Sequence, residues 1–115
     1  SLEETRKQKN AAIFVAKTKE GMAGYLIFYY VLEEGEIARI ATAHSVRRQG
    51  AASQMFWKLL DFCREQKITR IMLEVRENNE AARQFYGKCG FTKDGIRRNY
   101  YENPKENAVL MSVNL

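Results

Sequence analysis

The hydrophobic pattern changes its period at Gly50, and this change constrains the fold more than any other feature of the chain. Before Gly50, three runs rich in β-branched and aromatic residues are separated by turn signals at residues 19–21 and 33–36. This pattern predicts three strands joined as antiparallel hairpins, AAIFVAK, GYLIFYYVL and EIARIATA. After Gly50 the apolar residues recur at helical spacing until about Lys67; the apolar stripe contains Ala52, Phe56, Leu59, Leu60 and Cys63.

The second half of the chain is expected to add strands at residues 68–76, 91–101 and 108–113. A helix lies between the first two of these strands, with Asn79 as its cap and Gly90 at its end. The order strand, strand, strand, helix, strand, helix, strand, strand predicts an α/β protein with a mixed sheet. Because the first helix crosses between neighbouring strands, those strands should be parallel and leave a crevice at the start of the helix.

Length and composition indicate one domain, residues 1–115, with at most one active site. No apolar run is long enough to span a bilayer and no secretory signal is visible, so we expect a cytoplasmic protein without a membrane partner. Cys63 and Cys89 are far apart and lack metal-site spacing, which favours free, buried thiols and no metal. A net charge of +5 falls within the range needed for solubility, so no direct nucleic-acid binding is expected.

The turn before the first helix has the features of an anion site. Backbone amides at a helix start point outward and carry the positive end of the helix dipole, and neighbouring arginines add positive charge. A glycine lets ligand oxygens approach the backbone. A plain strand-to-helix turn with solvated arginines is the alternative. The residues of this turn are Arg47, Arg48, Gln49, Gly50, Ala51 and Ala52.

This turn and three later segments carry a resemblance to a known family. RRQGAA resembles the acetyl-CoA signature [QR]-x-x-G-x-[GA] of the GNAT N-acetyltransferases, and it lies after a strand and before a helix as that family requires. LEVRENNEAARQFYGKCGF, RRNYY and the closing AVLM are similar to the bacterial ribosomal-protein-alanine N-acetyltransferases of the RimI type. The resemblance covers the chain from about Gly24 onward. It implies the GNAT fold and acetyl-CoA as a co-substrate.

The resemblance also implies a site for each part of acetyl-CoA. The amides of residues 49–52, with Arg47 and Arg48 beside them, would hold the pyrophosphate. The backbone of Ile40, Ala41 and Thr42 would pair with the pantetheine arm as an added strand does, and Asn79 would bind the same arm. Asn79 is a helix cap on any interpretation.

By the same resemblance, Glu74 matches the general base and Tyr86 the general acid, while Tyr100 and Tyr101 line the acceptor's path. The chemistry agrees, because a phenol near pKa 10 can protonate a leaving thiolate. An α-amine near pKa 8 is neutral far more often than lysine, so a chain N-terminus is the easier acceptor. The alternatives are an ordinary cross-strand charge for Glu74 and a core aromatic for Tyr86.

The implied function is direct acetyl transfer to an α-amino group, with the N-terminal alanine of a ribosomal protein as the expected acceptor. Another N-terminus, a lysine or a small amine would keep the chemistry, and an acetyl-CoA-binding module without turnover is a further alternative. Members of the family usually begin with a strand and two helices that this sequence lacks, so the fold is expected to be N-terminally shortened. Asn107 also replaces an acidic residue often found there. Trp57 is expected in packing or a subunit contact, and a homodimer stays open.

Overall fold

The computed structural model describes residues 9–43 and 50–115, which form two compact units divided between Thr69 and Arg70. These residues contain six strands and two helices in the expected order. The α/β class predicted from the sequence is therefore confirmed. The parallel pairing expected across the first helix would join the two units and stays a prediction.

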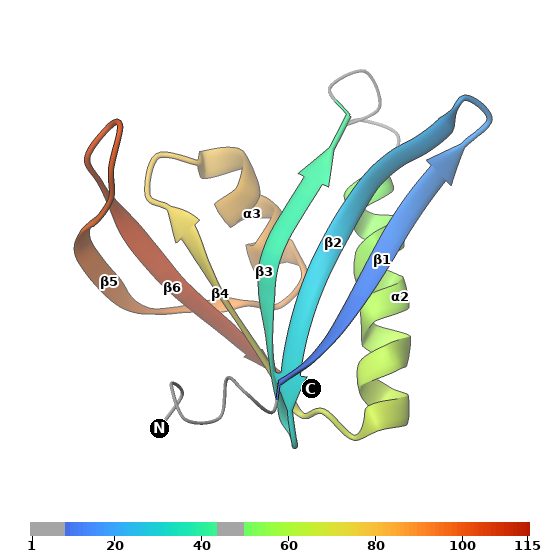
Figure 1. Ribbon diagram of the computed structural model, residues 1–115. Helices are drawn as coiled ribbons and strands as arrows, with labels where there is room; N and C mark the ends of the chain where they lie inside the picture. Colours follow the sequence, from blue (N-terminus) through green and yellow to red (C-terminus); the bar gives the residue numbers. More distant parts are fainter. Residues whose placement is uncertain (1–8, 44–49) are drawn as a thin grey trace. The chain divides into compact units, whose positions relative to one another are not determined.

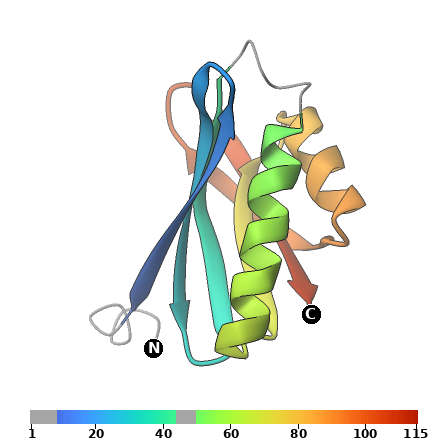
Figure 2. The same cartoon turned by 90° about the vertical axis from the view of Figure 1, so that its right-hand side faces the viewer.

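The first unit is an antiparallel meander with one helix packed on it. Its strands are β1 (Asn10–Thr18), β2 (Gly21–Val31) and β3 (Glu34–Thr42), with β2 in the middle, and its helix is α2 (Ala51–Gln66). Figure 2 shows α2 lying along one face of these strands. Lys58 Nζ donates to Val15 O across 2.8 Å and Gln54 Oε1 accepts from Lys17 N at 3.2 Å, so α2 is also tied to the edge strand β1.

The core of the first unit consists of apolar side chains from α2 and the meander. Leu26, Phe28, Met55, Leu59 and Cys63 are completely buried. Of the helix stripe predicted from the sequence, Phe56, Leu59 and Cys63 are buried, whereas Ala52 and Leu60 are half-buried. The prediction missed Ala51 and Met55, so the apolar face is rotated slightly from the predicted one. The Phe62 ring meets the rings of Phe14, Phe28 and Tyr30 edge-on at 5.5, 6.5 and 5.2 Å.

The end of α2 was also predicted correctly. Lys67 adopts a left-handed conformation (φ 61°), and the next amide, Ile68 N, donates to Cys63 O at 2.8 Å. This bond satisfies a carbonyl that the last helical turn leaves without a partner. The Trp57 side chain on α2 is 68% exposed, so packing within the chain is wrong and the subunit contact expected as the alternative stays a prediction.

The second unit is an antiparallel sheet with the last strand in its centre. It comprises β4 (Arg70–Arg76), α3 (Glu80–Lys88), β5 (Thr92–Tyr101) and β6 (Glu106–Asn114), and Figure 1 shows β6 between β4 and β5. The alternation expected in β4 is confirmed: Ile71, Leu73 and Val75 are buried, whereas the intervening side chains are half-buried. Strand β6 starts two residues earlier than predicted because Glu106 pairs with Tyr101.

Helix α3 begins and ends near its predicted signals. Asn79 Oδ1 accepts a hydrogen bond from Ala82 N at 3.2 Å, and Gly90 follows the helix with φ 98°. Both cysteines are free, as predicted. The prediction that both are buried is wrong for Cys89, which lies just after the last helical residue and is half-buried. Among the described residues, no helix is long and apolar enough to cross a membrane.

Candidate active site

The start of α2 keeps the features of an anion site where the structure describes it. Gly50 precedes the helix with φ 76° and ψ 20°, makes no side-chain capping hydrogen bond, and is followed by a first turn without an acidic residue. A Cβ added to Gly50 would meet no atom within 4 Å. The amides of Ala51 and Ala52 stand in the first turn of α2, where helix starts favour an anion, and their contact with the pyrophosphate of acetyl-CoA stays a prediction. Arg47, Arg48 and Gln49 lie outside the described residues.

The end of β3 holds the three residues predicted to pair with pantetheine. Ile40, Ala41 and Thr42 are half-buried and pair on one side with Leu26, Tyr25 and Gly24 of β2. Gly24 is needed for this close packing, because a Cβ there would lie 2.6 Å from Ala41 O and 3.2 Å from Met55 Cε. Gly24 on β2 thus lets the end of β3 and the Met55 side chain of α2 lie close to β2.

In the second unit, Glu74 points away from the buried face of β4 and its side chain is 28% exposed. Its Oε1 lies 3.5 Å from Nη1 of Arg97 on β5. The strand β6 runs between β4 and β5, where Leu110 pairs with Glu74 and the small Ala108 pairs with Arg97, so the ion pair runs diagonally across β6. The cross-strand pair considered as an alternative for Glu74 therefore exists, and it involves a residue that sequence reasoning missed.

Two tyrosines at the end of β5 and two arginines, one on β4 and one on β5, lie around Glu74. The guanidinium of Arg97 lies 4.9 Å from the Tyr100 ring centre, that of Arg76 lies 4.3 Å from the Tyr101 ring centre, and the two rings meet edge-on at 5.1 Å. Burial raises the pKa of Tyr101, and the charge of Glu74 raises it further, which places this phenol in the field of the carboxylate. The structure thus brings Glu74, Tyr100 and Tyr101 together, and their roles in the acceptor site stay a prediction.

The turn after β5 is held to the end of β4 by Arg76. Its guanidinium pairs with Glu106 Oε1 at 3.2 Å and donates to the carbonyls of Pro104 and Glu102 at 3.4 and 3.5 Å. The Glu106 side chain is only 9% exposed. Sequence reasoning missed both residues as parts of the site. The available signal was the position of Arg76, which shares a strand face with Glu74.

Asn107, which replaces an acidic residue common in relatives, is built into the same region. Its amide nitrogen donates to Glu77 Oε1 at 3.3 Å and its side-chain oxygen accepts from Asn99 N at 2.8 Å. A carboxylate could accept from Asn99 but could not donate to Glu77. The asparagine therefore fits this neighbourhood.

Tyr86 lies on the buried side of α3 and is 4% exposed. Its ring packs edge-on against Phe85 and Phe91, at 5.6 and 5.4 Å. Burial, with a smaller contribution from Cys89, raises the pKa of Tyr86 to about 12. The phenol therefore keeps its proton at neutral pH, although burial makes it a weaker acid than the ordinary tyrosine considered from the sequence.

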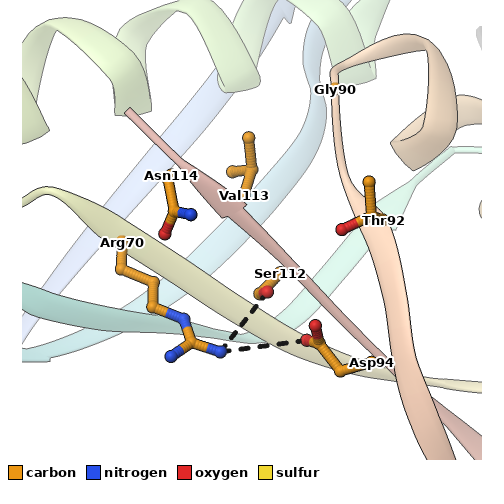
Figure 3. A pocket seen from close by; sticks show the side chains of 7 residues that line it. All are labelled: Arg70, Gly90, Thr92, Asp94, Ser112, Val113 and Asn114. Atoms are coloured by element: carbon orange, nitrogen blue, oxygen red, sulfur yellow. Dashed lines mark hydrogen bonds and ion pairs between the residues drawn. The ribbon is translucent and has the colours of Figure 1, made fainter.

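The second unit also contains a polar cavity of about 440 Å³, at the end where β4 begins. Figure 3 shows Arg70, Asp94 and Ser112 converging there from three strands. Arg70 Nη2 donates to Ser112 Oγ at 3.4 Å and lies 4.0 Å from Asp94 Oδ2. No predicted site residue lines this cavity, so we do not place acetyl transfer there. No cluster of three or more potential metal ligands occurs in residues 9–43 and 50–115.

Comparison with known proteins decides the family. The sequence pattern of the acetyltransferase (GNAT) family matches residues 1–91, which is more than half of the chain. The chain belongs to the GNAT family. The fold and the acetyl-CoA-dependent N-acetyltransferase class expected from the RRQGAA and LEVR segments are thereby confirmed.

Several GNAT proteins are similar over most of this chain. One is a Bacillus subtilis protein assigned as a ribosomal protein bS18-alanine N-acetyltransferase, 33% identical over 105 residues, or 90% of this chain and 70% of the relative. The bS18-alanine N-acetyltransferase of Haemophilus influenzae is 37% identical over 80% of this chain and 64% of the relative. This chain thus spans about two thirds of the length of these relatives.

Solved structures agree with the sequence comparison. The ribosomal-protein-S18-alanine N-acetyltransferase of Escherichia coli superposes with a TM-score of 0.84 at 29% identity, covering 99% of this chain and 76% of that one. A Bacillus anthracis protein, assigned as a streptothricin acetyltransferase, gives 0.83 at 26% identity over 92% of this chain and 63% of that one. That structure is a complex with acetyl coenzyme A.

Proposed function

We propose that this protein transfers the acetyl group of acetyl-CoA to the α-amino group of a protein, and that its acceptor is the N-terminal alanine of ribosomal protein bS18. The observation that carries the proposal is the Glu74 carboxylate beside Tyr100 and Tyr101, next to a turn held by Arg76. The similarity to bS18-alanine N-acetyltransferases supports this acceptor.

Each catalytic role follows from the chemistry of amide formation. Acetyl-CoA supplies an acetyl group activated as a thioester. The amine nitrogen forms a bond to the acetyl carbon, the carbon–sulfur bond breaks, and the nitrogen loses a proton. We propose that Glu74 takes this proton through a water molecule and that Tyr86, which stays protonated at neutral pH, donates to the leaving sulfur.

The two units are proposed to work as one acetyltransferase domain. The family match runs through residues 1–91 and so crosses the division between Thr69 and Arg70. Residues 40–42 and 47–52 are proposed to bind acetyl-CoA, and Asn79 is proposed to contact its pantetheine arm. We further propose a cytoplasmic location, where ribosomal proteins are made and thiols stay reduced.

An association of two copies is the remaining proposal about partners. Ile13 on β1 and Trp57 on α2 are each about two thirds exposed, at 67% and 68%. Large exposed apolar side chains favour an interface. Light scattering with Trp57→Lys as the test variant would measure this association, and a wild-type protein that is monomeric at high concentration would contradict it.

The decisive experiment is mass analysis of an alanine-starting bS18 peptide incubated with this protein and acetyl-CoA. We expect one added acetyl group on the α-amine. A second peptide with a blocked N-terminus and a free lysine separates α-amine from lysine transfer. Glu74→Gln should abolish most transfer, whereas Glu65→Gln, the same charge change on the exposed side of α2, should not.

The outcomes separate the candidate functions. Acetylation of the lysine peptide alone, or of a small amine alone, would move the acceptor to another class. Calorimetric binding of acetyl-CoA without transfer to any amine would indicate a binding module without turnover. Full activity of Glu74→Gln would contradict the assignment of the base.

A further inference from the structure

We propose that Arg97 is a positioning residue that neutralises Glu74 in the free protein, so that the acceptor site admits a neutral amine and disfavours an ammonium. This inference deepens the proposed function and rests on it. It assigns to Arg97 the selection of the reactive form of the acceptor and, through it, a preference for chain N-termini over lysines.

Arg97 is held against Glu74 by contacts on two sides. Its Nη1 lies 3.5 Å from Glu74 Oε1, and its guanidinium lies 4.9 Å from the Tyr100 ring centre. Between their strands lies Ala108, which is completely buried and pairs with Arg97 in the sheet register. Leu110, two residues further along β6, pairs with Glu74, so the ion pair runs diagonally across β6. The register of the three strands thus brings Arg97 and Glu74 within reach of each other.

The remaining charges near Glu74 are already matched. Arg76 at the end of β4 pairs with Glu106 of β6 at 3.2 Å, and Tyr101 of β5 is an uncharged phenol whose proton is retained near the carboxylate. Within the second unit, Arg97 is thus the cation assigned to Glu74. An incoming ammonium would add a positive charge to a cluster of two cations and two carboxylates that is balanced without it.

This balance matters because only a neutral amine can attack a thioester. A bare carboxylate would bind an ammonium more tightly than an amine and so hold the unreactive form. When Arg97 is paired with Glu74, the ammonium form binds the carboxylate with less advantage over the neutral amine. An α-amine titrates near 8 and lysine near 10.4, so at pH 7 the neutral form is roughly 200-fold more common for a chain N-terminus. A site that selects neutral amines therefore favours N-termini.

The test measures how the affinity for an alanine-starting peptide depends on pH, by calorimetry with coenzyme A in place of acetyl-CoA so that no transfer occurs. If only the neutral amine binds, the wild-type affinity should rise roughly 50-fold between pH 6 and pH 8 for an amine that titrates near 8. In Arg97→Gln the increase in affinity between pH 6 and pH 8 should be less than about a fifth of the wild-type increase, because the ammonium can now pair with Glu74. A peptide analogue without the α-amine corrects for titration of the protein.

Two variants separate selection from general effects. Arg98→Gln removes the same charge from the neighbouring, exposed position of β5 and should keep the wild-type pH dependence. Arg97→Lys keeps the positive charge and should keep most of the wild-type pH dependence of peptide affinity. An unchanged pH dependence in Arg97→Gln, or an equal loss in Arg98→Gln, would overturn the proposal for Arg97 while leaving the acetyl transfer of the wild type intact. A wild type that binds no α-amine peptide at any pH would overturn the proposed function itself.

Discussion

Replacing Tyr86 by phenylalanine removes only the hydroxyl group proposed to donate to the leaving sulfur. The ring is 4% exposed and packs against Phe85 and Phe91, so phenylalanine fits the same space and removes only the hydroxyl. Folding should change by less than about 1 kcal/mol, because the apolar contacts are retained. Any large effect on turnover would therefore report the hydroxyl.

The magnitude follows from the pKa of Tyr86. At about 12 it lies far above that of a free thiol near 8.5, so complete transfer of the proton to the thiolate is uphill by about 5 kcal/mol in the resting environment. The hydroxyl is then best described as a hydrogen-bond donor to the developing sulfur anion. A hydrogen bond to a charged group contributes about 1.5–3 kcal/mol, which corresponds to a loss of roughly 10- to 150-fold in kcat.

The assay is single-turnover release of the coenzyme A thiol, which isolates the chemical step from product release. Between pH 7 and 10 the wild-type rate should show no fall caused by ionisation of Tyr86, because burial keeps its pKa at about 12. Tyr29→Phe on β2 is a matched control and should keep full activity. A Tyr86→Phe rate within twofold of wild type would refute the reasoning and leave Tyr86 as a buried core aromatic.

Three further predictions concern stability. Gly35→Ala should destabilise the protein by about 2–3 kcal/mol, because the added Cβ would run into the Phe28 ring. Gly87→Ala in α3 should stabilise the protein by about 0.5–1 kcal/mol, because its Cβ would meet nothing within 4 Å. Urea unfolding of both variants would show whether the change in stability has opposite signs. Burial raises the pKa of the Cys63 thiol from 9.0 to about 11. The contribution of the neutral thiol to stability is therefore complete below pH 9 and lost by pH 11, which lowers the free energy of unfolding by up to about 3 kcal/mol. Unfolding at pH 8.5 and 10.5 should show this loss in the wild type and a smaller loss in Cys63→Ala. Asn79→Ala should cost about 1 kcal/mol through the lost cap, and an unchanged affinity for acetyl-CoA would contradict its proposed contact with the pantetheine arm.

The sequence by itself determined the features that depend on neighbours along the chain. The change of hydrophobic period at Gly50 and the caps at Asn79 and Gly90 were predicted correctly. Strand alternation, helix caps and positive φ are decided within a few residues, so local chemistry is sufficient. The family also followed from short motifs, because RRQGAA and LEVR both fall within the residues 1–91 that match the family.

Tertiary structure decided the features that depend on distant partners. The ion pair between Glu74 and Arg97 requires the register of β4 and β5 on either side of β6, and the anchor between Arg76 and Glu106 joins residues 30 positions apart. The raised pKa of Tyr86, the exposure of Trp57 and the half-burial of Cys89 likewise depend on which elements pack over each side chain. Burial and charge pairing are set by packing between segments far apart in the sequence, and no local pattern specifies them.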